Sequence, residues 1–133
     1  MPLEIPDVQS APVGPTVLIV EDNFLIALSL AEDLKAAGLC VAGPAASVAG
    51  AFDVLSQGKV DAVLLDVDLG RELSFPVAAF LTRHKTPFAF LTSYPVTEIR
   101  RLFPMAIIFE KSADVGAVIA GLQAMIAQAG VGL

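Results

Sequence analysis

The sequence predicts an α/β fold: a doubly wound, five-stranded parallel sheet with helices on both faces. Short apolar runs recur along the chain, and each is followed by a helix-like segment, which gives five rounds of strand and then helix. The runs are continuously apolar rather than alternating, which indicates strands that are covered on both sides, as in a parallel sheet. We expect the strand order 2-1-3-4-5, one of the two common orders of doubly wound sheets.

Five apolar runs are the predicted strands. They cover residues 17–20, 39–42, 62–65, 88–91 and 106–109. The first is rich in β-branched residues, which favour strands. The second is followed by Gly43-Pro44, a turn-forming pair that we expect to end it.

Helix-like segments follow the strands, and capping residues mark their ends. They cover residues 23–37, 47–57, 76–84, 96–102 and the segment after Ser112. Gly38 suits the C-terminal end of the first helix, and Pro76 suits the first turn of the third. Ser47 and Ser112 suit N-caps, and Asp114 then falls in the first turn of the last helix, where the dipole favours an anion.

The length of 133 residues suits one domain, and 56% hydrophobic residues are enough to fill its core. Residues 1–15 contain four of the nine prolines, so we expect a flexible leader there. The predicted domain covers residues 16–129, and residues 130–133 form a predicted tail.

The composition of the chain argues against nucleic acid and membrane as partners and indicates a cellular compartment. The net charge of −6 and the lack of a basic cluster argue against nucleic acid, whose phosphates need Lys and Arg. No apolar run approaches the roughly 18 residues of a membrane span, and no signal peptide is evident. Cys40 is the only cysteine, and its place in an apolar strand predicts a buried thiol. We therefore expect a cytoplasmic protein.

Three acids stand at the ends of predicted strands. Glu21 and Asp22 follow the first strand, and Asp66 follows the third. In a doubly wound sheet, ligands bind beyond the carboxyl ends of the strands, where the winding direction reverses. Three carboxylates that converge there would repel one another, and a divalent cation would relieve this repulsion. The pattern predicts a Mg²⁺ site, because Mg²⁺ prefers one or two carboxylates with water and phosphate oxygens.

Two further polar residues fall at the same edge of the predicted sheet. Thr92 ends the fourth strand, and Lys111 follows the fifth. A hydroxyl and an ammonium beside a carboxylate–metal site would hold a phosphoryl group, and a carboxylate can accept one covalently. Each residue alone has a simpler interpretation: Asp22 or Asn23, for example, would suit a helix cap. The three acids and the two predicted phosphate ligands, taken together, are difficult to explain as helix caps.

At these positions the sequence resembles response-regulator receiver domains. Residues 17–23 (VLIVEDN) are similar to the first strand and acidic pair of that family, and residues 61–69 (DAVLLDVDL) to its phosphoacceptor strand. Thr92 and Lys111 match its hydroxyl and lysine positions. The resemblance covers residues 16–128 and implies a flavodoxin-like fold and a phosphorylation-dependent switch of two-component signalling.

The resemblance also implies a role for each matched residue. Asp66 would be the phosphoacceptor, and Thr92 and Lys111 would contact the phosphoryl oxygens. The ligands of Mg²⁺ would be the carboxylates of Glu21, Asp22 and Asp66 and the backbone carbonyl of Asp68. The donor would be a sensor histidine kinase or a histidine phosphotransfer protein, and the signal would leave by protein–protein contact. The chain would not be an ordinary enzyme, although it would assist its own phosphorylation and dephosphorylation.

A narrower resemblance involves a subclass of mostly stand-alone receivers. Residues 90–94 (FLTSY) are similar to its Phe-Ala-Thr-Gly-hydrophobic-Tyr (FATGUY) signature, with matches at Phe, Thr and Tyr and departures between them. Residues 43–47 and 74–78 also resemble this subclass. The resemblance implies a histidine kinase partner of the kind used in stress and light signalling.

Two positions depart from the usual receiver pattern. Most receivers have a cis proline after the lysine, whereas here Ser112 follows Lys111. The following loop is expected either to take a different path or to keep a cis bond, which costs roughly 3 kcal/mol without proline. Ile108 occupies the position of the switching aromatic, and Phe109 should point to the opposite face of the strand. Tyr94 is a candidate for part of the missing aromatic's work.

Two alternative functions remain open from sequence. Asp66-Val67-Asp68 looks like the paired aspartates of haloacid-dehalogenase-type phosphatases, although that motif normally lies on the first strand of a longer chain. The second alternative is a degenerate receiver that binds a partner and is never phosphorylated. Turnover of small phosphate esters would identify the phosphatase. A protein that is not phosphorylated by a small-molecule donor such as acetyl phosphate would be the degenerate receiver.

The last predicted helix is unusual because Asp114 is the only charged residue from Ser112 to Leu133. Its core-facing residues are expected to be Val115, Val118, Ile119, Leu122 and Ile126. Small residues form the other side: Ala117, Ala120, Gly121, Ala124 and Ala127. Either neighbouring loops cover this side, or it is a contact surface for a partner helix or a homodimer.

Overall fold

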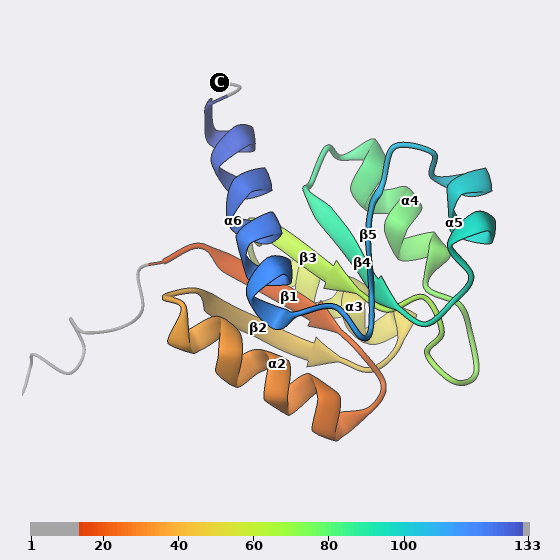
Figure 1. The fold of residues 1–133 in the computed structure, drawn as a ribbon, viewed down its shortest axis with the longest axis horizontal. Coiled ribbons are helices and arrows are strands. Elements are labelled where there is room, and N and C mark those ends of the chain that lie inside the picture. Colours follow the sequence, from red (N-terminus) through yellow and green to blue (C-terminus); the bar gives the residue numbers. More distant parts are fainter. Residues whose placement is uncertain (1–13, 132–133) are drawn as a thin grey trace, which may run out of the picture.

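The computed structural model describes residues 14–131 and places them in one parallel sheet with the strand order β2-β1-β3-β4-β5 (Figure 1). The strands are β1 (Thr16–Val20), β2 (Cys40–Ala45), β3 (Ala62–Leu65), β4 (Phe88–Thr92) and β5 (Ile107–Glu110). The helices are α2 (Phe24–Ala36), α3 (Val48–Gln57), α4 (Phe75–Arg83), α5 (Val96–Leu102) and α6 (Val115–Val131). The predicted fold class and strand order are confirmed. The first 13 residues of the predicted leader and the last two of the predicted tail lie outside the described residues.

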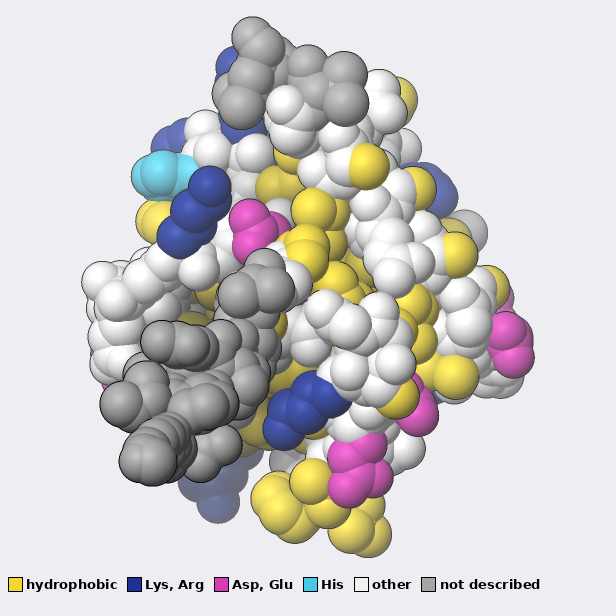
Figure 2. All heavy atoms as spheres, turned by 90° about the vertical axis from the view of Figure 1, so that its left-hand side faces the viewer, with side chains coloured by type: hydrophobic (Ala, Val, Ile, Leu, Met, Phe, Trp, Pro, Cys, Tyr) yellow, Lys and Arg dark blue, Asp and Glu magenta, His cyan; other side chains and the backbone are white. Residues whose placement is uncertain are grey.

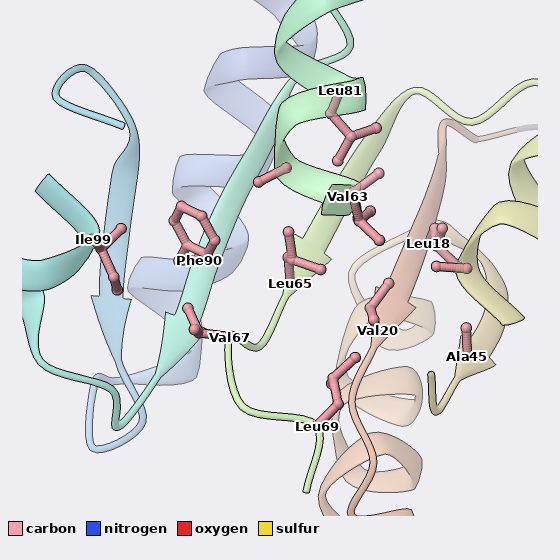
Figure 3. Packing of buried hydrophobic residues seen from close by; sticks show 13 residues of the cluster. Leu18, Val20, Ala45, Val63, Leu65, Val67, Leu69, Leu81, Phe90 and Ile99 are labelled. Atoms are coloured by element: carbon pink, nitrogen blue, oxygen red, sulfur yellow. The ribbon is translucent and has the colours of Figure 1, made fainter. Parts of the chain in front are cut away.

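Helices cover both faces of the sheet, and each face has its own core. On one face, α2 and α6 pack on β1, β3 and β4 through Ala27, Leu34, Val118 and Leu122. On the other face, α3, α4 and α5 cover a larger cluster around Phe90 (Figure 3). Every residue of β3 is buried, which is why this strand is a continuous apolar run.

Side chains that cap helices fix where two of them begin. Asn23 accepts a hydrogen bond from the N–H of Ile26, and Ser47 accepts one from Gly50. Asn23, rather than Asp22, is therefore the cap of α2, which leaves the Asp22 carboxylate free for other contacts. Gly38 has a φ of +91° just after the end of α2, as expected for a glycine at this place.

The second and fifth strands differ from their predicted bounds. The prediction that Gly43-Pro44 ends the second strand is wrong, because β2 continues to Ala45. The pairing with β1 shifts register between Leu18 and Val20, and this irregularity admits the proline. Because β2 is an edge strand, its proline removes no ladder hydrogen bond from a second neighbour. The fifth strand lies one residue later than predicted.

The start of α6 also differs from the prediction. Asp114, not Ser112, is the N-cap: its carboxylate accepts a 3.3 Å hydrogen bond from the N–H of Ala117. Val118 and Leu122 are buried as predicted, but Val115 lies in the first turn and is 37% exposed.

One interpretation of the small residues on α6 required neighbouring loops to cover them, and the structure does not show this coverage. Ala117, Ala120, Ala124 and Ala127 are all exposed, so the interpretation that loops bury this side is wrong for them. Gly121 alone is covered, by the ring of Phe109.

The burial of Cys40 and the presence or absence of a membrane-spanning helix can both be checked in the structure. Cys40 is half-buried rather than buried, and its thiol donates to the carbonyl of Gly14 at 3.2 Å. Among residues 14–131, no helix combines the length and apolar character that a bilayer crossing requires.

Candidate functional site

The predicted site residues meet at the carboxyl edge of the sheet. Val20 and Leu65 pair in the β1–β3 register, so the residues that follow them, Glu21 and Asp66, come side by side. Thr92 ends β4, the other neighbour of β3, and Lys111 follows β5. The sheet order thus brings together residues that lie up to 90 positions apart in the chain.

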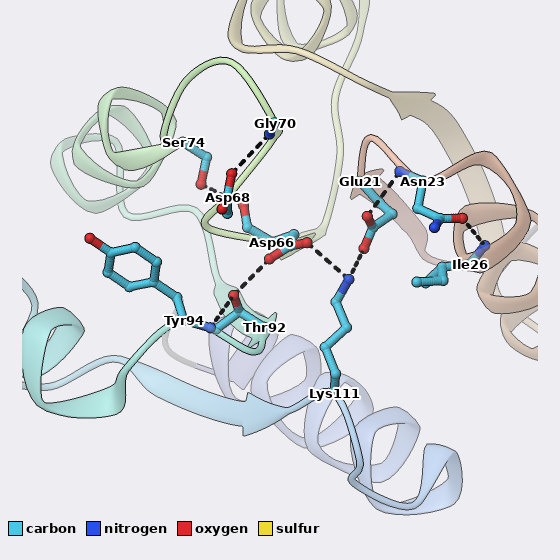
Figure 4. Close-up of polar contacts among 10 residues, drawn as sticks. All are labelled: Glu21, Asn23, Ile26, Asp66, Asp68, Gly70, Ser74, Thr92, Tyr94 and Lys111. Carbon is cyan, nitrogen blue, oxygen red and sulfur yellow. Dashed lines mark hydrogen bonds and ion pairs between the residues drawn. The ribbon is translucent and has the colours of Figure 1, made fainter.

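Asp66 is the centre of this group (Figure 4). Its side chain is only 8% exposed, and both carboxylate oxygens have partners. The hydroxyl of Thr92 donates to Oδ1 at 2.7 Å, and Nζ of Lys111 lies 2.9 Å from Oδ2. These two donors hold a charged carboxylate in a largely buried place, where an unpaired one would be costly.

Lys111 also forms an ion pair with Glu21, so one ammonium contacts two acids. Burial raises the pKa of Glu21 above its ordinary value, and the hydrogen bonds from Lys111 and from the Asn23 N–H only partly offset this. Burial acts to lower the pKa of Lys111, but the hydrogen bonds to Glu21 and Asp66 and their charges outweigh it, so this pKa is raised. Lys111 therefore favours its protonated, charged form. For Glu21, the hydrogen bonds do not fully compensate the cost of burying its negative charge.

Three acids form a candidate cation site. Glu21, Asp22 and Asp66 each offer a carboxylate oxygen, and these oxygens all lie within 4.8 Å of one another. Asp22 is exposed, and the other two are buried. An all-oxygen set with one open side suits a hard divalent cation that keeps part of its water.

A loop glycine leaves room beside these acids. Gly70 has a φ of +90°, and a Cβ at this position would lie 3.0 Å from Oδ2 of Asp22. Asp22, Asp66 and Gly70 help to line an open pocket of about 470 Å³. The loop therefore favours glycine for its backbone conformation and for the space beside the acid.

The side chain of Asp68 is directed to its own loop. Its Oδ1 accepts a 2.9 Å hydrogen bond from the N–H of Gly70 (Figure 4). Asp68 also lines the pocket. Its carboxylate is not one of the three that lie within 4.8 Å of one another, so the predicted metal contact of its backbone carbonyl stays a prediction.

Thr92 connects the acceptor to an aromatic cluster. The hydroxyl that donates to Asp66 also accepts from the N–H of Tyr94 at 3.1 Å. The Tyr94 ring packs edge-on against Phe75, with 5.9 Å between centroids. Ile108 packs in this same cluster, whereas Phe109 packs on the opposite face, as predicted.

The bond between Lys111 and Ser112 is trans, since Gly43-Pro44 is the only cis peptide bond of the described chain. The loop thus follows the first of the two paths that the sequence left open. Lys111 nevertheless reaches Asp66, so proline at the next position is not needed to place its ammonium.

Sequence reasoning missed one buried polar contact of the acceptor. The hydroxyl of Ser74 donates to the backbone carbonyl of Asp66 at 2.6 Å, and Ser74 is fully buried. The available signal was a serine immediately before Phe75-Pro76, where it reads as an ordinary helix cap. Nothing in the sequence indicates that its hydroxyl is directed to the acceptor strand.

Comparison with known proteins places this arrangement in a structural class. No protein-family model matches the chain, and no curated protein matches it either. Many solved structures do match. The receiver protein from Sinorhizobium medicae WSM419 is 22% identical with a TM-score of 0.77, over 85% of this chain and 94% of that one. The receiver domain of PhyR from Erythrobacter litoralis is 27% identical with a TM-score of 0.71, over 85% and 90%.

A third match was solved in a phosphorylated form. A response regulator from Burkholderia pseudomallei, solved with a phosphorylated aspartic acid, a calcium ion and citrate, is 23% identical with a TM-score of 0.72. The match covers 88% of this chain and 71% of that one. The chain thus has the fold of a response-regulator receiver domain, as the sequence resemblance implied.

Proposed function

We propose that the chain is a phosphorylation-dependent switch that accepts a phosphoryl group on Asp66. The observation that carries this proposal is the pairing of the Asp66 carboxylate with the Thr92 hydroxyl and the Lys111 ammonium. Two further acids beside it, Glu21 and Asp22, supply the oxygens for a divalent cation. Phosphoryl transfer needs an acceptor, compensation of negative charge, and groups that donate hydrogen bonds to the phosphoryl oxygens. Residues suited to all three tasks meet here.

The reaction that fits is transfer from a phosphohistidine of a histidine kinase or phosphotransfer protein. A carboxylate oxygen of Asp66 forms a bond to phosphorus while the phosphorus–nitrogen bond to the imidazole breaks. The electron pair of the broken bond stays on the imidazole, which takes up a proton as it leaves. The phosphoryl group is conserved, and no oxidant or reductant is needed.

The residues of the chain stabilise this transfer. Lys111 compensates charge on the phosphoryl oxygens, because its ammonium already contacts Asp66 and its pKa is raised. Thr92 donates its hydroxyl to the acceptor, and this donor is free to turn to a phosphoryl oxygen once the carboxylate is esterified. Preorganised donors of this kind contribute most where charge develops in the transition state.

The acids fit Mg²⁺ on chemical grounds. Glu21, Asp22 and Asp66 are hard oxygen donors, and Gly70 keeps the space beside Asp22 open. We propose the backbone carbonyl of Asp68 as a further ligand. The ion, when bound, supplies positive charge that neutralises the acids and the incoming phosphoryl oxygens.

Exposed apolar residues beside the site suggest where a phosphodonor protein docks. Phe24, Leu25 and Leu28 at the start of α2 are 69%, 73% and 43% exposed. Leu25 and Lys111 line a hollow of about 430 Å³ between α2 and α6. We propose these exposed residues and this hollow as the docking face of the donor. Figure 2 views the molecule from the left of Figure 1, the side on which β1 and β2 begin, and hydrophobic side chains there lie between separate charged groups.

The two alternatives are less well supported. A paired-aspartate phosphatase uses its second acid as a general acid, but the Asp68 carboxylate accepts a hydrogen bond within its own loop. A degenerate receiver would lack part of the phosphate-binding set, yet Thr92 and Lys111 both contact Asp66. We therefore favour the phosphoacceptor switch.

The direct test is mass measurement after incubation with acetyl phosphate and Mg²⁺. We expect a gain of one phosphoryl group in the wild type and none in Asp66→Asn. Asp68→Asn makes the same chemical change two residues later and should keep most of the gain. Equal loss in both variants would support the paired-aspartate phosphatase, and an unlabelled wild type would support the degenerate receiver.

A further inference from the structure

One buried polar side chain beside the site has no role in the proposed transfer. The buried polar residues of the described chain are Glu21, Asp66, Ser74 and Thr92. Asp66 is the proposed phosphoacceptor, Thr92 donates a hydrogen bond to it, and Glu21 belongs to the candidate cation site. Ser74 is 0% exposed, and its hydroxyl donates to the Asp66 carbonyl at 2.6 Å (Figure 4).

Ser74 stands at the N-cap of α4 but does not act as a usual cap. An N-cap serine normally accepts a hydrogen bond from the first turn of its helix, whereas the Ser74 side chain makes no such bond. Its N–H instead donates to the carbonyl of Val67 at 2.8 Å, and its own carbonyl accepts from Val77 and Ala78. Ser74 therefore joins the start of α4 to the two residues that follow β3.

The bond from Ser74 completes the fixation of Asp66. The N–H of Asp66 donates to Val20 of β1 at 3.0 Å, and its carbonyl accepts from Ser74. Thr92 and Lys111 hold the two carboxylate oxygens. The four contacts come from four separate parts of the fold, so neither the backbone nor the side chain of the acceptor can turn without breaking one.

We propose that Ser74 is a positioning residue for phosphoryl transfer. Its hydroxyl fixes the peptide that follows Asp66, and thereby sets the direction of the acceptor carboxylate relative to Thr92 and Lys111. This inference rests on the proposed function of Asp66. Transfer rates depend steeply on such placement, since a displacement of about 1 Å can cost on the order of 100-fold.

A merely structural role has a different consequence. A buried hydroxyl needs a partner in any protein, and its loss would then lower stability without changing the reaction of the folded protein. Thr82 of α4 provides a control for the loss of a hydroxyl-to-carbonyl bond away from the site, because its hydroxyl, on an exposed residue, donates to the carbonyl of Ala78 at 2.9 Å. Both hydroxyl-to-carbonyl bonds can be removed by substitution with alanine.

The test compares labelling kinetics of wild type, Ser74→Ala and Thr82→Ala with acetyl phosphate at saturating Mg²⁺, well below each melting temperature. For Ser74→Ala we expect the maximal labelling rate to fall about tenfold, while the acetyl phosphate concentration at half-maximal rate stays within about twofold. Thr82→Ala should label like the wild type. A wild-type rate in folded Ser74→Ala would overturn the positioning role.

Two further outcomes are distinguishable. If Ser74→Ala does not fold, Ser74→Cys keeps a side chain of similar size with a weaker donor, and its labelling rate should lie below that of the wild type. A folded Ser74→Cys with the full rate would overturn the inference. If the wild type is itself not labelled, the proposed function fails, and the role of Ser74 fails with it.

Discussion

Nζ of Lys111 lies 2.9 Å from Oδ2 of Asp66, and the same ammonium forms an ion pair with Glu21. The side chain of Lys111 is 22% exposed, whereas those of the two acids are 8% and 3% exposed. A single cation thus serves two largely buried carboxylates. Its removal would leave both acids without a cationic partner, which is more costly than the loss of a surface ion pair.

Lys111→Met should therefore destabilise the metal-free protein at neutral pH, by about 2 kcal/mol. The loss is smaller than that for a fully buried pair, because Lys111 is partly exposed. Replacement of the exposed Lys35 by Met is the control and should change the unfolding free energy by less than about 0.5 kcal/mol. Urea denaturation measures both.

The same variant reports the direction of the Lys111 pKa. A lysine whose pKa is raised in the folded state stabilises the fold at pH values below its ordinary pKa of 10.5. This contribution disappears as the pH rises through the higher pKa of the folded protein. The stability difference between the wild type and Lys111→Met should thus shrink in strongly alkaline solution. A difference that stays constant through that range would contradict the raised pKa.

Mg²⁺ should stabilise the protein in a concentration-dependent way. Glu21, Asp22 and Asp66 repel one another, and a ligand that binds only the folded state raises the melting temperature. The double variant Glu21→Gln with Asp22→Asn should lose this response. The control, Glu32→Gln with Asp33→Asn, removes an acidic pair of the same composition from α2 and should respond like the wild type. If the first variant also responds fully, the cation binds elsewhere.

Gly70→Ala should weaken Mg²⁺ binding as well as the fold. Alanine at a φ of +90° costs about 1–2 kcal/mol, and its Cβ would lie 3.0 Å from Oδ2 of Asp22. Gly38→Ala is a matched control, since Gly38 has a φ of +91° and open space around it. Both variants should lose similar stability without metal, but only Gly70→Ala should need more Mg²⁺ for its thermal shift. An equal Mg²⁺ requirement would show that Asp22 is not crowded.

The general fold followed from features that are local in the sequence. The continuous apolar runs at β1 and β3 and the acids directly after them identify a parallel sheet and the edge at which sheets of this kind bind ligands. The position of Lys111 after β5 then places its ammonium correctly without any knowledge of its loop. These features could be predicted because strand ends of a parallel sheet meet at one edge.

The errors concern features that depend on neighbours far away in the chain. Gly43-Pro44 stays within β2 because this strand has a partner, β1, on one side only. Asp114 caps α6 in place of Ser112 because the path after β5 decides where the first turn begins. Ser74 contacts Asp66 across a loop of seven residues, and no pattern of residue types records that contact.

The uncharged side of α6 leads to the last prediction, which concerns self-association. Ala120 and Ala124 are exposed, and between Val115 and Val131 the helix has no charged residue. Small exposed side chains permit a second helix to approach closely, so we expect a homodimer through this surface. Placing Glu at both positions should weaken the dimer by charge repulsion and desolvation while the fold stays intact. Sedimentation over a range of protein concentrations measures the change.

A control for this prediction adds the same charges to the other face of the sheet. Ala49 on α3 and Ala79 on α4 are also exposed, and Glu at both should leave the dimer unchanged. A wild type that stays monomeric at high concentration would disprove self-association. If the two Glu residues on α6 instead unfold the protein, that side of the helix is covered in solution. Labelling of Asp66 by acetyl phosphate should be the same in both variants, because neither pair of substitutions is part of the group that contacts the acceptor.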